Sequence, residues 1–428
     1  MITVLADRHH YQLERFLHPS LRLVQYDPIA GWTADQVREA DALLIRTTNP
    51  VNSRTLPENS RVRFVATASA GRDHLDETWL NRLGITIADA KGSNARSVAE
   101  YVAVAVLSAC ETLETPPSEL TAGVVGAGFT GSAAADLLER LGIKCKLHDP
   151  PREERERATG REAVRNADRN ADRNTDRNAD RNADRNADRN ADRNADRNAT
   201  ARQPFPEAPF NSASLEEVLQ CDILTLHVPL ERSGPHATWR WLDGVKLAAG
   251  QKKLVINASR GSVVDEGVML AAHERGHVRA FVCDVWEGEP VFSDATARQA
   301  YLSTPHIAGY SIEAKRNASE IMCMALHRFF GLADPEPPEV QPHPQELPGG
   351  DLTLRNVLGH LHPAFSYDAD LRKLIGRPDA EKGPAFLRLR QDTPLRNEFA
   401  EIGLDADVLR RHPVLAELGF RSIKTDIN

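Results

Sequence analysis

Residues 121–149 read TAGVVGAGFTGSAAADLLERLGIKCKLHD, and this stretch decides the fold. An apolar run leads into Gly126, Gly128 and Gly131, which have G-x-G-x-x-G spacing, and a helix-like run follows. In such a turn the first glycine permits the tight bend, the second lets the backbone approach a pyrophosphate, and the third allows close packing of helix on strand. Asp149 ends the next apolar run. Strand, turn, helix and acid in this order predict a Rossmann-like dinucleotide-binding unit.

The acidic residue of this unit indicates which dinucleotide it binds. The carboxylate of Asp149 would accept hydrogen bonds from the ribose hydroxyls of NAD and would repel the additional phosphate of NADP. We therefore predict NAD, although Arg152 lies close enough in the sequence to leave NADP open. The alternative, that the glycines only pack a helix against a sheet, is disfavoured by the complete strand–turn–helix–acid context.

The sequence on both sides of this unit alternates strand-like and helix-like runs. Residues 1–90 contain four short β-like runs between helical ones, and Thr33 is a predicted helix N-cap. After residue 213 a capping box, Ser214 with Glu217, precedes three apolar strands. Near-continuous apolar strands are typical of a parallel sheet that is buried on both faces. The predicted fold class is α/β, with two Rossmann- or flavodoxin-like parallel-sheet domains, a cleft between them and a small C-terminal α/β domain.

Changes in composition predict the domain organisation. The segment LADPEPPEVQPHPQELPGG is rich in proline and is typical of a linker. The expected parts are a substrate-binding domain of residues 1–95, completed by about 306–332, an NAD-binding domain of 96–305 with a low-complexity insert at 152–203, a linker at 333–349, and a C-terminal domain at 350–428.

Residues 165–200 repeat the motif RNAD with a period of four. They contain no apolar side chain larger than alanine, so they cannot bury a core, and we expect mostly disorder or at best a marginal helix. Each Asp cancels an Arg, so the field that would attract a nucleic acid is weak. A long insertion in a surface loop costs little free energy. The repeat is therefore interpreted as an interruption of the function and not as its carrier, although a modulation of NAD affinity stays open.

Composition excludes several other classes of function. The net charge of −8 argues against nucleic-acid binding, and the five cysteines are scattered without a C-x-x-C pair. The longest apolar run, residues 98–110, is too short to span a bilayer, and the N-terminus shows no secretory signal. No spacing of metal ligands is visible, so no metal is predicted. We expect a cytoplasmic protein without membrane or nucleic-acid partners.

Three segments beyond the repeat carry candidate chemistry: NASRGSVVDE at 257–266, DVWEGEP at 284–290 and STPHIAGY at 303–310. Each follows a strand-like run or lies in a loop, and ligands of open α/β sheets bind at the carboxyl ends of the strands. Arg260, Glu289 and His306 are therefore expected to converge there. A guanidinium can hold a carboxylate, an imidazole can take a hydroxyl proton, and a carboxylate can orient the imidazole. Each could instead be an ordinary surface residue, but the flanking glycines and the HIAGY context favour a catalytic trio.

Several further motifs carry a resemblance to a known family. They include IRTTNPVN at 45–52, FVATASAGRDHLDE at 64–77 and GSNARSVAEYV at 92–102. With the glycine turn and the three catalytic segments, they make the chain similar to the NAD-dependent D-2-hydroxyacid dehydrogenases over almost its whole length. The motifs HDPP, WEGEP and HIAGY indicate a narrower branch that acts on a small phosphorylated 2-hydroxy acid.

This resemblance implies roles for individual residues. Arg260 would bind the substrate near the nicotinamide, Glu289 would pair with His306, and His306 would accept the proton. Residues on the cofactor side would be Gly126, Gly128, Phe129, Thr130, Gly131, Asp149, Val228, Ala258, Ser259, Arg260, Asp284 and Gly309. Residues on the substrate side would be Thr47, Ser69 and Tyr310, with Arg72 hypothesised to hold the phosphate. Ser69 and Val228 both stand where threonine is expected, which puts the cofactor contact of Val228 in doubt.

The sequence thus predicts an NAD-dependent dehydrogenase that forms a homodimer through its C-terminal domain, as the resemblance of the tail implies. Two alternatives remain. One is a dehydrogenase for another small 2-hydroxy acid, and the other is a non-catalytic protein that senses NAD(H). The complete set of Arg260, Glu289 and His306 favours an enzyme, because a sensor does not need all three.

Overall fold

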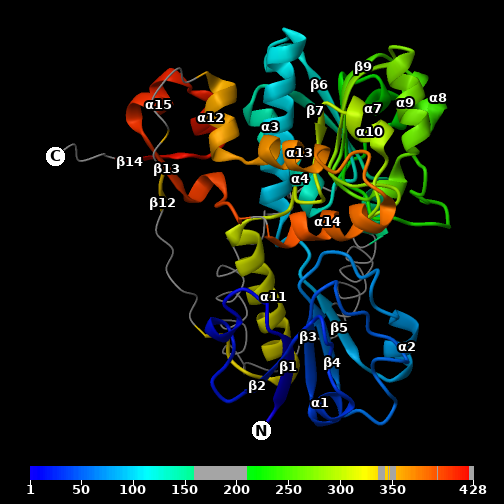
Figure 1. Cartoon of the computed structure of the whole chain (residues 1–428), viewed down its shortest axis with the longest axis vertical. Helices are drawn as coiled ribbons and strands as arrows, with labels where there is room; N and C mark the ends of the chain where they lie inside the picture. Colours follow the sequence, from blue (N-terminus) through cyan, green and yellow to red (C-terminus); the bar gives the residue numbers. More distant parts are fainter. Residues whose placement is uncertain (159–209, 336–342, 346, 348–352, 393, 424–428) are drawn as a thin grey trace, which may run out of the picture.

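A computed structural model describes residues 1–158, 210–335, 343–345, 347, 353–392 and 394–423. The RNAD repeat, most of the predicted insert and much of the predicted linker lie outside the described residues. Two parallel sheets form the body of the protein, one above the other in the view of Figure 1, and the C-terminal segments lie beside and between them.

The lower sheet in Figure 1 has five parallel strands in the order β2-β1-β3-β4-β5. This is the strand order of flavodoxin-like folds. Helix α11 (Ile312–Phe330) returns from far along the chain and buries Met322, Cys323 and Leu326 against strand residues of this sheet. The strands are β1 (Thr3–Asp7), β2 (Arg22–Tyr26), β3 (Ala42–Ile45), β4 (Phe64–Thr67) and β5 (Thr86–Asp89), and its short helices are α1 (Ala34–Glu39) and α2 (Glu77–Arg82).

The upper sheet has six parallel strands in the order β11-β10-β9-β8-β6-β7, so the strand order reverses between β6 and β8. Ligands of open α/β sheets bind at such a switch point. The strands are β6 (Thr121–Val125), β7 (Lys144–His148), β8 (Ile223–Leu226), β9 (Lys252–Asn257), β10 (Val278–Cys283) and β11 (Leu302–Ser303). The helices are α3 (Ala95–Leu113), α4 (Phe129–Arg140), α7 (Leu215–Leu219), α8 (Gly244–Ala248), α9 (Glu266–Glu274) and α10 (Asp294–Gln299).

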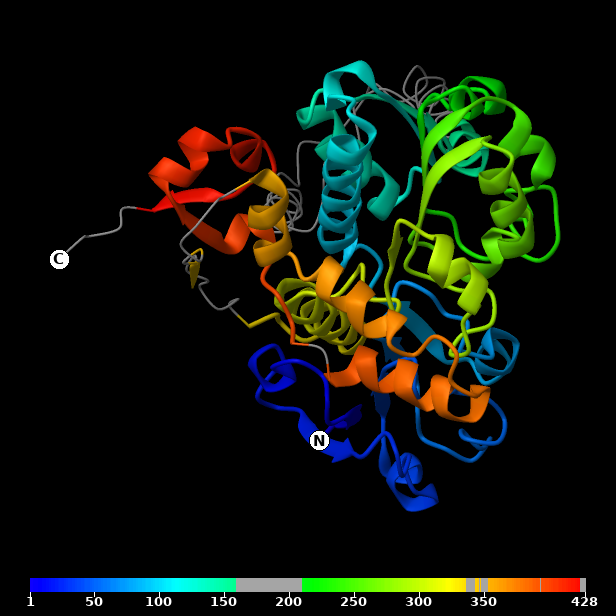
Figure 2. The ribbon, with the colours of Figure 1, turned by 45° about the horizontal axis from the view of Figure 1, so that its top comes forward.

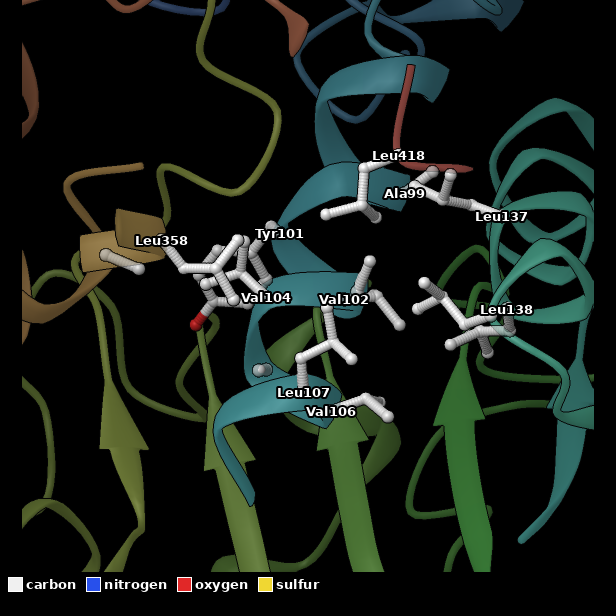
Figure 3. Close-up of a cluster of buried hydrophobic side chains, with 14 of the residues drawn as sticks. Ala99, Tyr101, Val102, Val104, Val106, Leu107, Leu137, Leu138, Leu358 and Leu418 are labelled. Carbon is white, nitrogen blue, oxygen red and sulfur yellow. The ribbon is translucent and has the colours of Figure 1, made fainter. Parts of the chain in front are cut away.

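Helix α3 is the centre of the largest buried cluster. Its residues Val98–Cys110 are all buried, because the helix is covered on several sides at once. Figure 3 shows Leu137 and Leu138 of α4 on one side of it, with Leu358 and Leu418 of the C-terminal segments approaching from other directions. An all-round apolar helix is typical of a position between two packed layers.

The C-terminal segments pack on the rest of the chain and share its core. Leu371 and Phe386 are buried in the cluster of the upper sheet, and Leu358 and Phe399 in that of α3, so no described buried cluster belongs to the tail alone. In Figures 1 and 2, α14 lies at the junction of the two large sheets. The elements are β12 (His343–Pro344), α12 (Leu354–Leu361), α13 (Ala364–Arg372), α14 (Asp379–Asp392), β13 (Ile402–Asp405), α15 (Ala406–Arg411), α16 (Val414–Glu417) and β14 (Arg421–Ile423), with the strands in one parallel sheet.

The predicted α/β fold class with two parallel sheets and a small C-terminal sheet is confirmed. The capping box at Ser214 and Glu217 and the N-cap at Thr33 are confirmed as well. The predicted start of the insert at residue 152 is wrong. Residues 150–158 are helical, and the buried side chain of Arg152 donates a hydrogen bond of 2.6 Å to the carbonyl oxygen of Ala127, so this segment belongs to the folded domain. Among the described residues, no helix is long and apolar enough to cross a membrane.

A buried carboxylate joins the C-terminal tail to the two large domains. Glu398 Oε1 accepts hydrogen bonds from Ser97 Oγ of α3 at 2.8 Å and from Ser311 Oγ, before α11, at 3.0 Å. Burial, together with the charge of the fully buried Glu100, raises the pKa of Glu398 to about 7. Because the pKa of Glu398 is raised in the folded state, the stabilisation that Glu398 gives to the folded protein is complete at low pH and is lost as the pH rises through about 7.

We predict that Glu398→Gln, which removes the charge but keeps hydrogen-bonding groups, gains stability relative to the unmodified protein as the pH rises from about 5 to 8. The relative gain in Tm should be roughly 2–6 °C, measured by thermal unfolding at both pH values. Glu417→Gln, at an exposed position of the tail, is the control and should show no pH-dependent difference. If the difference in Tm between Glu398→Gln and the unmodified protein is the same at both pH values, the raised pKa of Glu398 is contradicted.

Candidate active site

Three neighbouring parallel strands of the upper sheet end at the same edge. β9, β10 and β11 end at Asn257, Cys283 and Ser303, and the loops that follow carry Arg260, Glu289 and His306. Because the strands are parallel, all three loops leave from the carboxyl edge of the sheet, as the sequence predicted.

His306 and Glu289 form a hydrogen-bonded pair. His306 Nδ1 lies 2.8 Å from Glu289 Oε2, and the other carboxylate oxygen accepts the Trp286 N–H at 3.0 Å. Burial by itself would raise the pKa of Glu289. This effect is outweighed by the hydrogen bond and charge of His306, by the hydrogen bond from the Trp286 N–H and by the charge of Arg390, so the pKa of Glu289 is lowered. An ionised carboxylate only accepts hydrogen bonds, so Nδ1 carries the proton and Nε2 of a neutral imidazole is the basic nitrogen.

The loop that carries His306 is held by Asp284. Its Oδ1 accepts the Thr304 hydroxyl at 2.6 Å and the Ile307 N–H at 2.8 Å, and its Oδ2 accepts the Ala308 N–H at 3.0 Å. The carboxylate is buried, and the backbone of His306 has a φ of 58°, a conformation that β-carbon-bearing residues adopt only when their surroundings enforce it. Asp284 therefore positions the imidazole, and its predicted contact with NAD stays a prediction.

Arg260 extends from the upper sheet towards the lower one. Its guanidinium donates to the Ser259 carbonyl at 2.8 Å, lies 3.6 Å from the carboxylate of Asp73 and packs against Gly71, in the loop after β4. A side chain on Gly261 would collide with the carbonyl group of Trp286, so the backbone after Arg260 lies directly on the loop that holds Glu289. The arginine thus lies between the two sheets and next to the Glu289 loop.

The glycine turn has the geometry that a pyrophosphate requires. Gly126 has a φ of 89° and faces His227 and Val228, and a Cβ on Gly131 would collide with the carbonyl oxygen of Gly126. At Gly128, the N-cap of α4, no other described part of the chain comes within 4 Å of where a Cβ would lie. The backbone is therefore bare at the positively polarised end of a helix, where an anion binds.

The acidic end of this site favours NAD over NADP. Asp149 accepts the Ala127 N–H at 2.8 Å and the Arg152 N–H at 2.9 Å, which fixes its carboxylate beside the turn. The guanidinium of Arg152, besides donating to Ala127, bonds Glu156 at 2.7 Å and stacks on Phe210 at 4.4 Å. It is thus occupied within the protein, and the carboxylate remains to meet a ribose. These residues fit NAD.

The other predicted cofactor residues lie around the same edge. Phe129 is 43% exposed with its ring against Gly92, and Gly309 packs directly on Asn94, so both connect to the segment that joins the two sheets. Ser259 is buried and donates its hydroxyl to Asn257 at 2.9 Å, which leaves a structural role for that hydroxyl. Thr130, Ala258 and Val228 are partly buried, and their roles stay predictions.

On the substrate side, Thr47 is exposed after β3, and Ser69 and Tyr310 are half-buried. The predicted phosphate ligand, Arg72, donates to Asp89 at 2.6 Å and lies 3.7 Å from Glu77. Two carboxylates therefore already balance its charge, which weakens the hypothesis that Arg72 is reserved for the substrate.

Sequence reasoning missed the supporting residues. Thr304 lies within the quoted segment STPHIAGY, but nothing local indicates that its hydroxyl would bond Asp284. Arg390, whose charge acts on Glu289, lies 84 positions after His306 in a segment without any motif, so no sequence signal could have found it.

The geometry agrees with what known proteins show. The family model described as "D-isomer specific 2-hydroxyacid dehydrogenase, catalytic domain" matches residues 3–337. The chain belongs to this family. The chain is also similar to individual curated proteins and to individual proteins of solved structure.

Several curated relatives are named erythronate-4-phosphate dehydrogenase. That of Marinobacter nauticus is 37% identical over 86% of both chains, and that of Ectopseudomonas mendocina is 32% identical over 97% of both. Among solved structures, the D-lactate dehydrogenase of Aquifex aeolicus, in complex with NAD and lactic acid, is 18% identical and superposes with a TM-score of 0.51. The match covers 77% of this chain and 95% of the dehydrogenase chain. At that identity the structure supports the family's fold.

We predict that Glu289→Gln lowers kcat about 100-fold or more, because a neutral amide cannot stabilise the imidazolium that forms when His306 takes a proton. The lowered pKa keeps Glu289 ionised at neutral pH, and its contribution is lost only as the pH falls through this folded-state pKa. The defect should therefore be nearly constant between about pH 6 and 8.

The matched control is Glu287→Gln, in the same loop, whose carboxylate pairs with Arg240. It should keep nearly full activity in steady-state assays. Equal losses in the two variants would indicate a general disturbance of the loop and contradict the specific role of Glu289.

Proposed function

We propose that the protein oxidises 4-phospho-D-erythronate to 2-oxo-3-hydroxy-4-phosphobutanoate with NAD, a step in the biosynthesis of pyridoxal phosphate. The observation that carries the proposal is the bonded pair of His306 and Glu289 at the carboxyl edge of the upper sheet, with Arg260 on a neighbouring loop. The substrate is inferred from the relatives that bear the name erythronate-4-phosphate dehydrogenase.

His306 provides the base of the reaction. Its Nε2 takes the proton of the C2 hydroxyl, and the imidazolium that results is stabilised by the ionised Glu289 through Nδ1–H. The electron pair of the O–H bond forms the new C=O bond while hydride leaves C2. The glycine turn and Asp149 would hold NAD, which would supply the acceptor for that hydride. The two electrons travel with the hydride and the proton stays on the imidazole, so the step is balanced.

Arg260 orients the substrate for this transfer. A planar guanidinium presents parallel N–H donors to a carboxylate, which fixes C1 and therefore the plane from which hydride leaves C2. Its place between the two sheets lets the substrate be held from both domains. The neighbouring Asp73 carboxylate, at 3.6 Å, is a weak partner that a bound carboxylate can replace.

The proposal includes a homodimer formed through residues 350–428, which rests on the resemblance of the tail. Light scattering during size-exclusion chromatography of the full chain tests it. We expect twice the mass of one chain, and a monomer at micromolar concentration would contradict the dimer.

We predict NADH formation with 4-phospho-D-erythronate in clear preference to D-glycerate, D-lactate and 3-phospho-D-glycerate, measured with an oxo-acid trap so that held product does not mask turnover. His306→Ala should lower kcat roughly 1,000-fold while NAD still binds, because only the base is removed. Better turnover of another acid would reject the proposed substrate and keep the mechanism. Binding of NAD without turnover of any acid would reject the enzyme.

A further inference from the structure

Two cations meet around the ring of Tyr310, four residues after the catalytic His306. Lys315 of α11 places its ammonium 5.1 Å from the centre of the ring. Arg390 of α14 places its guanidinium carbon 5.9 Å from the same centre, and its Nη2 lies 3.4 Å from the Tyr310 hydroxyl. The three side chains come from different parts of the chain, and the tail supplies one of them.

These cations lack the acidic partners that others near the site have. In the part of the chain that the structure describes, no carboxylate lies within 4 Å of the charged nitrogens of Lys315 or Arg390, whereas Arg46 pairs with Asp7 and Arg72 with Asp89. The Nε of Arg390 is buried and makes no hydrogen bond there. A desolvated donor without an acceptor costs free energy unless a ligand completes it.

The electrostatics of the surroundings add to this cost. Burial lowers the pKa of Lys315, and the nearby Arg46 lowers it further. Arg390 in turn is close enough for its charge to lower the pKa of Glu289, the partner of His306. Two half-buried cations therefore lie at the ring of Tyr310, with a third cation near Lys315, and a dianion bound there would relieve their repulsion.

We propose that Lys315 and Arg390, together with the hydroxyl of Tyr310, form the subsite for the phosphate group of the substrate, an inference that rests on the proposed function. The acid has two anionic ends, and Arg260 is assigned to the carboxylate. A phosphate offers three acceptor oxygens, which suit a fork of guanidinium donors and a point-charge ammonium. The tail thus takes part in choosing the substrate, because Arg390 belongs to α14.

The first experiment compares kcat/KM for 4-phospho-D-erythronate and for unphosphorylated D-erythronate. Lys315→Met should lower the value for the phosphorylated acid roughly 10- to 100-fold and change that for D-erythronate little, because it loses charged hydrogen bonds to phosphate only. Arg390→Met should lower the value for both acids, since its charge also acts on Glu289, and should lower that for the phosphorylated acid roughly 10- to 100-fold more. Arg390→Lys should restore part of the preference. Arg388→Met, at an exposed position of the same helix, is the control and should behave as the unmodified protein.

The second experiment uses inorganic phosphate and needs no turnover. Phosphate should raise the Tm of the unmodified protein and of Arg388→Met, and should raise that of the Lys315→Met, Arg390→Met double variant clearly less. If this difference appears while 4-phospho-D-erythronate is not oxidised, the proposed substrate fails and the phosphate subsite stands. Equal losses of kcat/KM for both acids would overturn the subsite. So would variants that keep both the preference for the phosphorylated acid and the full rise of Tm with phosphate.

Discussion

The buried carboxylate of Asp284 joins the end of β10 to the loop that carries the imidazole of His306. It accepts one hydroxyl and two backbone N–H groups from that loop, which compensates its removal from water and fixes His306 in a backbone conformation it would not otherwise adopt. The Thr304 hydroxyl that bonds Asp284 also contacts the Tyr101 hydroxyl of α3 at 2.7 Å. The orientation of the base therefore depends on the same helix around which the largest core is packed.

The C-terminal helices act on the same region from the other side. Phe386 of α14 packs near Phe292, with ring centres 6.1 Å apart, and Lys382 pairs with Asp294 at 2.8 Å. These contacts hold α14 against the segment that follows the Glu289 loop. The tail, for which the resemblance implies dimerisation, thus also packs against the segment after Glu289 in the candidate active site. Its buried side chains also join the cores of the other domains.

The candidate site divides into parts that local sequence encodes and parts that it does not. The glycine turn, Asp149 and the trio of Arg260, Glu289 and His306 follow from strand–loop patterns, because parallel strands bring their carboxyl ends to one edge. The pairing of Arg72 with Asp89, which competes with the predicted role of Arg72, depends on the pairing of β5 with β4, which brings the end of β5 beside the loop after β4. The role of the Arg152 guanidinium is likewise decided by a contact with Ala127 across the turn.

The sequence by itself determined the α/β class, the glycine turn with the acidic residue that follows it, and the candidate residues Arg260, Glu289 and His306, because each depends on short-range periodicity or on spacing within one loop. Only the tertiary structure decided which charges are neutralised and which remain for a ligand. That outcome depends on contacts such as those of Arg390 with Tyr310, between residues 80 positions apart. Burial and charge pairing are properties of the folded surface, and no local pattern of residues specifies them.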